Sequence, residues 1–365
     1  MTELPFHRER PGSSVATPLA LSQLREFDAV IDARSPSEFA EDHLPGAINV
    51  AVLDDAERAQ VGTIYKQQSS FEAKRIGAPF ASRNIARAIE TTFADRPRHW
   101  RPLVYCWRGG GRSGSLVHVL RQVGWDAVRL DGGYKAFRRQ VVTDLEESPR
   151  HFSFHVICGA TGSGKSRLLE ALAEAGAQVL DLEVLAAHRG SVLGELPDNP
   201  QPTQKSFETS LWTALSEFDP KRPVFVESES KKVGNLRVPD ALITRMRESK
   251  CLRLEAGTAT RVQLLMEDYA HFVARPAALA AKLDCLAPLH GAERIGTWKA
   301  HLERGEWDAL VRELLESHYD PAYRRSLFRN YVQAQDAAPV EVRDISRAGF
   351  LALARRLARD HGHIG

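Results

Sequence analysis

The chain has 365 residues, of which 43% are hydrophobic, and its formal net charge is only +2. This length fits two domains with sizeable cores, and the small net charge gives no global attraction to nucleic acid. Mean hydropathy is −0.32 and no apolar run approaches the ~18–20 residues of a membrane helix, so we expect no membrane span.

The first fifteen residues are charged and contain proline but no apolar stretch, so we expect no signal peptide. The four cysteines are far apart in the sequence and form no CxxC pair. This spacing argues against a disulfide framework and against a zinc site, and it is typical of a reducing compartment. We therefore expect a cytoplasmic protein.

Short apolar runs that end in polar loops alternate with helical spacing along the first 140 residues, which predicts a parallel α/β sheet. Strands are expected at residues 29–32, 103–105 and 127–130, and a helix at residues 113–123. A polar, proline-containing stretch at residues 143–151 then predicts a domain boundary.

The boundary divides the chain into domain 1–145 and domain 150–365. The second domain again alternates strands with helices, and it becomes mostly helical between residues 258 and 315. Its expected strands are residues 152–158, 178–182, 223–227, 252–255 and 339–342. A closing helix is expected at residues 347–359.

The segment from Cys106 to Ser113 places a cysteine at a strand end and a glycine-rich turn before a helix. Backbone N–H groups in such a turn form an anion nest, and the helix N-terminus adds positive potential. Both lower the pKa of a thiol, so Cys106 is expected to be a nucleophile. Glycines allow the tight turn, and guanidinium groups bind tetrahedral oxyanions. The residues in question are Arg108, Gly109, Gly110, Gly111 and Arg112.

A second anion-binding loop, from Gly159 to Ser166, has the G-x4-G-K-S pattern of a P-loop. Its backbone wraps phosphates, Lys165 neutralises terminal oxygens, and Ser166 is placed to hold Mg²⁺. The other glycines of the pattern are Gly162 and Gly164. The ligand stays open, because ATP, GTP and a prenyl diphosphate all present a diphosphate. We expect no tightly bound cofactor, with Mg²⁺ as an accompanying ion.

Three acidic residues follow expected strands of the second domain and are candidate bases or Mg²⁺ ligands: Asp181, Glu183 and Glu227. Oxygen ligands suit Mg²⁺. The alternative is that they are solvated acids at strand ends.

The first domain resembles the rhodanese (sulfurtransferase) family over about residues 15–140. The resemblance rests on residues 32–39 (DARSPSEF), 43–49 (HLPGAIN), 105–106, 124–125 and 131–134. Five residues separate Cys106 from Arg112, whereas many single-domain rhodaneses have four. Such a wider loop also occurs in phosphatases that share the rhodanese fold, so loop length alone leaves chalcogen transfer and phosphatase chemistry open.

From about Asp28 to Leu327 the chain resembles the tRNA 2-selenouridine synthase family, in which a rhodanese domain is fused to a P-loop domain. The resemblance rests on the two loops and on residues 62–66, 71–77, 181–191, 201–208 and 226–234. It implies an α/β fold in which a rhodanese-like parallel-sheet domain precedes a P-loop NTPase-like domain with a helical C-terminal part.

The resemblance also implies an activity. The family replaces sulfur by selenium in 2-thiouridine at the tRNA wobble position, through an S-geranyl intermediate. The implied substrates are geranyl diphosphate at the P-loop and selenophosphate at Cys106, which would act as nucleophile or selenium carrier. The implied partners are the tRNA anticodon region and a selenophosphate synthetase that supplies selenophosphate.

Two polar or basic aromatic segments are candidates for tRNA binding, because such mixtures stack on splayed bases and contact phosphates. They contain His188, Arg189, Tyr323, Arg324, Arg325 and Arg329. The alternatives are a plain helix cap and an amphipathic helix with solvated arginines. Two other functions stay open: a phosphatase or sulfurtransferase fused to a nucleotide-binding P-loop module, and a non-catalytic P-loop switch.

Overall fold

The computed structural model describes residues 14–191, 193–196 and 198–361. Most of the N-terminal stretch, for which we expected no signal peptide, lies outside these residues. The chain forms two compact units. Unit 1 comprises Met1–Leu145 and Thr203–Glu217, and unit 2 comprises Glu146–Pro202 and Phe218–Gly365.

Unit 1 contains a parallel five-stranded sheet in the order β1-β5-β4-β2-β3. The strands are β1 (Ser14–Val15), β2 (Ala29–Asp32), β3 (Ala47–Asn49), β4 (Pro102–Tyr105) and β5 (Val128–Leu130). The helices are α1 (Leu21–Leu24), α2 (Pro36–Glu41), α3 (Asp55–Gln67), α4 (Ser70–Thr91), α5 (Gly111–Val123), α6 (Gly133–Glu147) and α9 (Gln204–Glu217). The central strand β4 is buried along its whole length. This explains why it is an uninterrupted apolar run.

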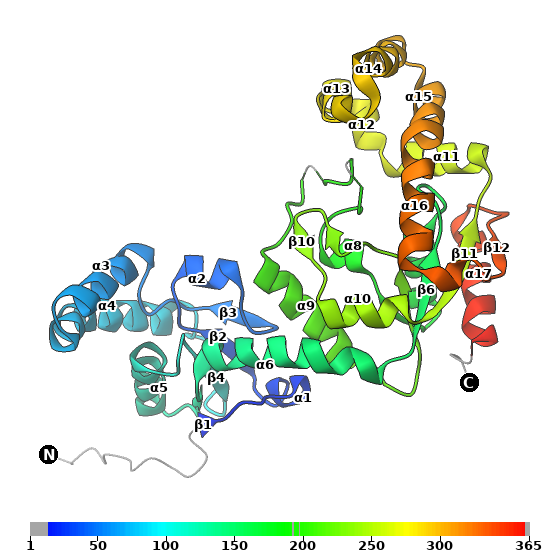
Figure 1. Ribbon diagram of the computed structural model, residues 1–365. Coiled ribbons are helices and arrows are strands. Elements are labelled where there is room, and N and C mark those ends of the chain that lie inside the picture. The colour runs from blue at the N-terminus through cyan, green and yellow to red at the C-terminus, as the bar shows by residue number, and fades with distance from the viewer. Residues whose placement is uncertain (1–13, 192, 197, 362–365) are drawn as a thin grey trace, which may run out of the picture. The chain divides into compact units, whose positions relative to one another are not determined.

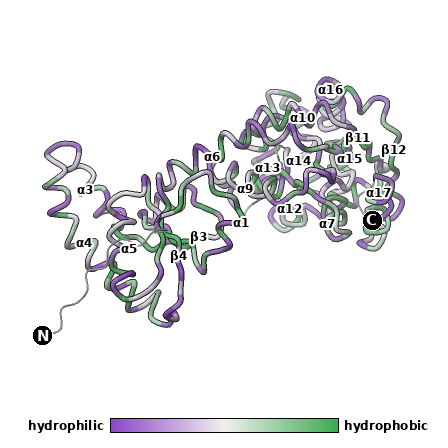
Figure 2. Tube along the Cα trace, turned by 90° about the horizontal axis from the view of Figure 1, so that it is seen from below, coloured by the Kyte–Doolittle hydropathy of each residue, from purple (hydrophilic) through white to green (hydrophobic). Residues whose placement is uncertain are grey.

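Helices α3 and α4 form a hairpin that extends away from the sheet of unit 1 (Figure 1). Asp54 caps α3 by accepting a hydrogen bond from the Glu57 amide at 2.8 Å, and Ser69 caps α4 through the Glu72 amide at 3.0 Å. Such side-chain caps satisfy backbone donors that the first helical turn leaves free. The sequence pattern predicted no helix in this region. Helix α3 is mostly hydrophilic (Figure 2).

Helix α9 belongs to unit 1, although its sequence lies between segments of unit 2. The ring of Trp212 meets that of Phe137 on α6 edge-to-face at 5.4 Å. The Trp212 indole N–H also donates to Asp144 at 2.7 Å. The Thr209 hydroxyl donates to the buried Asp42 carboxylate at 3.0 Å. Buried polar partners of this kind fix the position of a helix as well as contributing packing.

Unit 2 contains a second parallel five-stranded sheet, in the order β12-β11-β6-β8-β7. Its strands are β6 (Phe154–Cys158), β7 (Gln178–Leu180), β8 (Val224–Glu227), β11 (Lys250–Glu255) and β12 (Pro339–Glu341). All five lie within two residues of the expected positions. A short antiparallel pair, β9 (Lys232–Val233) and β10 (Leu236–Arg237), follows β8.

The helices of unit 2 include the expected closing helix and the expected helical region. They are α7 (Lys165–Glu174), α8 (Leu182–Leu185), α10 (Asp240–Arg247), α11 (Thr258–Asp268), α12 (Ala270–Ala274), α13 (Pro276–Asp284), α14 (Ala287–Arg304), α15 (Trp307–Leu314), α16 (Asp320–Asn330) and α17 (Arg347–Asp360). Shorter turns are η1 (Ser148–His151), η2 (Leu315–Tyr319) and η3 (Val332–Ala334).

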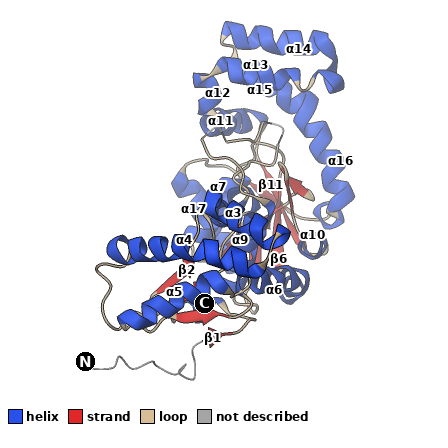
Figure 3. Cartoon of the chain, turned by 90° about the vertical axis from the view of Figure 1, so that its left-hand side faces the viewer, coloured by secondary structure: helices blue, strands red, loops and turns tan. Residues whose placement is uncertain are grey.

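Helices α12 to α15 gather at one end of unit 2 (Figure 3) around a core of their own that contains the fully buried Trp298. Helices α7 and α17 pack together against the sheet. Among the helices of the described residues, none is long and apolar enough to cross a membrane.

Candidate active site

Cys106 follows β4 directly, and its side chain is buried, with 3% of its surface exposed. The Ser113 hydroxyl, in the first turn of α5, donates a hydrogen bond to the Cys106 sulfur at 3.2 Å. Burial raises the pKa of this thiol, but hydrogen bonds from Ser113, the charge of Arg112 and the backbone of Arg108 outweigh it and lower the pKa. A lowered pKa favours the thiolate, which is the nucleophilic form.

The turn at Gly132 and Gly133 packs against the backbone of the cysteine loop. The amides of Tyr134 and Lys135 donate to the carbonyls of Cys106 and Trp107, both at 2.9 Å. Gly133 has a φ of +55°, and a Cβ there would overlap the Cys106 carbonyl oxygen and lie 2.6 Å from the Gly109 nitrogen. Only glycine allows two backbone segments to approach this closely.

The two arginines of the loop have different surroundings. Arg112 pairs with the Glu38 carboxylate, a residue that the sequence did not single out. Burial raises the pKa of Glu38, but the hydrogen bond and charge of Arg112 outweigh it and lower the pKa. Arg108 is exposed at the mouth of the loop. The loop therefore offers an incoming anion an exposed guanidinium at Arg108 and an already paired one at Arg112.

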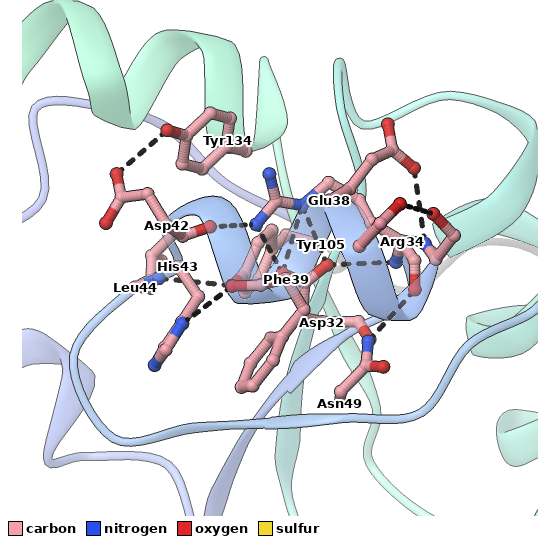
Figure 4. Close-up of polar contacts among 12 residues, drawn as sticks. Asp32, Arg34, Glu38, Phe39, Asp42, His43, Leu44, Asn49, Tyr105 and Tyr134 are labelled. Atoms are coloured by element: carbon pink, nitrogen blue, oxygen red, sulfur yellow. Dashed lines mark hydrogen bonds and ion pairs between the residues drawn. The ribbon is translucent and has the colours of Figure 1, made fainter. Parts of the chain in front are cut away.

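A buried network holds the strand ends beside this loop (Figure 4). Arg34 donates to both carboxylate oxygens of Asp32 at 2.6–3.0 Å and to the Asp42 carbonyl at 2.6 Å. Its guanidinium lies 3.9 Å from the centre of the Tyr134 ring, and the Tyr134 hydroxyl donates to Asp42 at 2.8 Å. Because Arg34 is almost completely buried, these partners are needed to keep its charge inside the protein. This gives a structural reason for the DARSPSEF segment.

The P-loop of unit 2 lies between β6 and α7, as expected. Gly162 and Gly164 have φ values of +77° and +87°, which only glycine adopts readily. The Lys165 ammonium donates to the Gly159 carbonyl at 2.7 Å. The Ser166 hydroxyl donates to Glu183 at 3.1 Å. Lysine and hydroxyl thus converge on one pocket, with the loop amides around it.

The expected acidic residues lie beside this loop. Glu183 lines the P-loop pocket, and its backbone amide donates to Glu227 at 2.9 Å. Asp181 caps α8 through the Val184 amide. Burial raises the pKa of all three acids, and neighbouring carboxylates raise it further. The second Glu227 oxygen is buried with no hydrogen-bond partner among the described residues.

Glu229 is a functional candidate that the sequence did not reveal. It lines the same pocket, and burial together with the charge of Glu183 raises its pKa to about 8. A Cβ at Gly190 would lie within 2.9 Å of carboxylate oxygens from both Glu183 and Glu229. The only sequence signal was its spacing, two residues beyond Glu227. In the described part of the chain, no group of three or more His, Cys, Asp or Glu side chains is arranged to hold a metal ion.

The candidate tRNA-binding residues separate into three groups. Arg189 and Tyr323 line the P-loop pocket, where the Tyr323 ring centre is 5.8 Å from the Lys165 nitrogen. His188 is buried, and burial lowers its pKa. The remaining three are exposed on α16: Arg324, Arg325 and Arg329. Contact of any of these residues with tRNA stays a prediction.

An apolar cavity adjoins the P-loop pocket inside unit 2. The two share Thr161, Leu265 and Tyr269 in their walls. The cavity continues between α11, α12, α15 and η2, and its deeper lining includes Phe272, Trp307, Leu310, Leu314 and Tyr319. A phosphate-binding loop beside a hydrocarbon-lined cavity fits a ligand with a charged head and an apolar tail.

The fold and the loops define an α/β protein that combines a rhodanese-like domain with a P-loop domain. Comparison with known families supports both halves: residues 17–140 match the rhodanese-like domain, and residues 152–284 match the AAA domain of tRNA 2-selenouridine synthase.

Several similar proteins are named tRNA 2-selenouridine synthase. The one from Nitrosomonas europaea is 38% identical over 66% of this chain and 63% of its own length. Those from Shewanella denitrificans (36% identical) and Bdellovibrio bacteriovorus (30%) align over 80% and 83% of this chain, and over 87% and 90% of their own lengths. The chain belongs to the tRNA 2-selenouridine synthase family. Its alignment covers less than two thirds of the Nitrosomonas relative.

Proposed function

We propose that this chain converts 2-thiouridine at the tRNA wobble position to 2-selenouridine through an S-geranyl intermediate. The observation that carries the proposal is the apolar cavity beside the P-loop. A nucleotide would place a polar base and ribose beyond its diphosphate, whereas geranyl diphosphate would place a hydrocarbon chain there. Family membership supports tRNA as the second substrate.

In the first step, the thiouridine sulfur attacks C1 of the geranyl group. The C–S bond forms as the C–O bond to diphosphate breaks, and the base loses its N3 proton. Loop amides and the Lys165 ammonium, released from the Gly159 carbonyl, stabilise the charge on the departing diphosphate. The oxygen groups of Ser166 and Glu183 suit Mg²⁺, which would supply further charge neutralisation when bound.

In the second step, the cysteine loop binds selenophosphate, supplied by a selenophosphate synthetase. The Cys106 thiolate attacks phosphorus and releases selenide, and water then hydrolyses the phosphocysteine to phosphate and free thiol. Selenide adds to C2 of the geranylated base and expels geranyl thiolate, which is a better leaving group than the original sulfur. The lowered pKa of the Cys106 thiol supports its role as the nucleophile in this step.

The proposal is tested by mass spectrometry of nucleosides from 2-thiouridine-containing tRNA. The tRNA is incubated first with protein, geranyl diphosphate and Mg²⁺, and then with selenophosphate. We expect S-geranyl-2-thiouridine followed by 2-selenouridine. Lys165→Ala should slow geranylation about 100-fold or more, as expected when a transition-state charge contact is lost, while tRNA that is already geranylated should be selenated at the wild-type rate. Cys106→Ser should accumulate the geranylated base without selenation.

An unmodified nucleoside with folded wild-type protein would contradict the proposal. Phosphate release from a simple phosphoester that depends on Cys106 and needs no RNA would instead support a phosphatase. Formation of 2-selenouridine in the absence of geranyl diphosphate would contradict the S-geranyl intermediate but not the selenation itself.

A further inference from the structure

One face of α3 leads from the cysteine loop to the tip of the α3–α4 hairpin. At the loop end, the Glu38 carboxylate that binds Arg112 also lies 3.6 Å from the Arg58 guanidinium. The Arg58 side chain extends along the helix, since a Cβ at Gly62 would meet its Nη1 atom at 2.6 Å. Tyr65 is seven residues beyond Arg58, so it lies on the same helical face. Along the helix axis, this spacing amounts to about 10 Å.

The tip carries two large aromatic side chains that are mostly exposed. Tyr65 is 63% exposed and Phe71 is 68% exposed, on either side of the short turn between the helices. They are among the few large hydrophobic side chains of the described residues that are exposed to this extent. The hairpin does not need them for its own packing, because the helices meet where Val61 contacts Gly77.

The tip is also positively charged. Residues 65–75 contain Lys66, Lys74 and Arg75 against one acid, Glu72, which pairs with Arg75 at 2.7 Å. The two lysines are exposed, and the turn between the helices is made of glutamine and serine. Exposed rings among cations and amides are the combination that binds single-stranded nucleic acid, since rings stack on bases while cations contact phosphates.

We propose that the hairpin tip, defined as residues 65–75, binds unpaired tRNA bases next to the base that is modified at Cys106. This inference rests on the proposed function, because it takes tRNA as the substrate. A base held at the cysteine loop would lie at the Arg58 end of the α3 face, and its neighbours would be held at the other end, by Tyr65 on α3 and by Phe71 in the first turn of α4.

The charge of the tip favours RNA over a protein partner as its occupant. A protein interface core is typically depleted of lysine. Here Lys66 follows Tyr65 directly and Lys74 lies three residues after Phe71, and both lysines are exposed. The inference adds a surface to the tRNA contacts expected from residues 188–189 and 323–329.

The test measures binding of full-length protein to a labelled anticodon stem-loop by fluorescence anisotropy. In the Tyr65→Ala/Phe71→Ala variant we expect Kd to rise at least tenfold, because each lost stacking contact weakens binding by about that factor. Tyr65→Phe keeps the ring and should bind like the wild type. Lys66→Gln/Lys74→Gln should reduce the slope of log K against log[salt] by about 1.4, the value for two single-strand phosphates.

Controls separate the tip from general effects of mutation. Val123→Ala/Leu289→Ala removes two exposed apolar side chains elsewhere and should leave Kd unchanged. A fully paired RNA duplex without a loop should bind wild type and tip variant equally. Geranyl diphosphate binding should be the same in all variants, which shows that unit 2 is intact. In addition, 4-thiouridine placed beside the modified base should crosslink to peptide 65–75.

Two outcomes would overturn the inference in different ways. Equal stem-loop affinity of wild type and the double alanine variant would refute the tip as an RNA surface while leaving the proposed function standing. Absence of stem-loop binding by the wild type, with geranyl diphosphate bound normally, would refute the proposed function, and the inference with it.

Discussion

At the residue scale, the reactivity of Cys106 depends on one neighbouring hydroxyl. Ser113 is fully buried, and its hydroxyl hydrogen bonds to the sulfur at 3.2 Å. A hydrogen bond to a charged group is worth about 1.5–3 kcal/mol, or roughly one to two pKa units. The sequence pattern predicted a nucleophilic cysteine, but it assigned the effect to the loop amides and helix end alone.

We predict that Ser113→Ala raises the pKa of the Cys106 thiol by about one unit, because the thiolate loses this donor. The measurement is the rate of alkylation of Cys106 against pH, resolved by peptide mass spectrometry. Ser115→Ala is the matched control, since its hydroxyl donates to the Arg112 carbonyl and does not contact the sulfur. An unchanged alkylation midpoint in Ser113→Ala would show that the loop backbone and the charge of Arg112 lower the pKa without the hydroxyl.

Glu229 gives a pH-dependent stability. Burial, the charge of Glu183 and a hydrogen bond with it raise the pKa from 4.5 to about 8, against the opposing effects of Lys165 and the Ser230 amide. Between these pH values the folded protein holds a proton that the unfolded chain has released. This contribution to stability is therefore complete below pH ~4.5 and is lost as pH rises through about 8.

We predict that the melting temperature falls between pH 5 and 8 and that Glu229→Gln flattens this dependence. Each pH unit in the window changes the free energy of unfolding by up to ~1.4 kcal/mol for this one group. Scanning calorimetry from pH 5 to 8 measures the melting temperature of the wild type and of the variant. Glu248→Gln, at an exposed position, serves as control. A variant with the same slope as the wild type would contradict the raised pKa.

At the scale of elements, strands were predictable and the hairpin was not. The buried strands β4, β6 and β8 are short and mostly apolar, a pattern that single-sequence reasoning detects. Helix α3 has no buried residue, so its apolar periodicity is too weak to identify it. The two loops were found because their motifs are local, whereas Glu38 and Glu229 reach the sites through tertiary packing.

The first residues of α6 hold the cysteine loop in place, and a substitution at Gly133 tests this role. Gly133→Ala should destabilise unit 1 by roughly 2 kcal/mol or more, because it adds left-handed strain to a direct overlap with the loop backbone. Denaturant unfolding measures the lost free energy of unfolding. The alkylation rate of Cys106 should also change, because the variant displaces the cysteine loop. Gly114→Ala, a helical glycine of α5 with open space around it, should be neutral or slightly stabilising.

At the scale of the whole molecule, sequence order and spatial units do not coincide. Domain limits read from the sequence put α9 in the second domain, while the contacts put it in unit 1. We therefore predict that a fragment of residues 1–150 melts lower than the same fragment with residues 203–217 joined by a flexible linker. Without α9, Phe137 and Asp42 lose their partners Trp212 and Thr209.

The comparison is made by thermal melting and by binding of a hydrophobic dye. A Trp212→Ala/Thr209→Val version of the joined fragment should melt like the short fragment. Equal melting of the short and joined fragments would show that α9 contributes nothing to unit 1.

The shared helix also restricts how such a chain can evolve. A domain that packs against a helix encoded inside its neighbour cannot be separated with that helix by a single cut of the gene, because one cut leaves the helix with the other piece. Recombination that separated the rhodanese-like part from the P-loop part would lose α9 from the former and open the latter between Pro202 and Phe218. If α9 stabilises unit 1 as predicted above, chain topology alone would disfavour such separation, independently of any benefit of having both chemistries in one polypeptide.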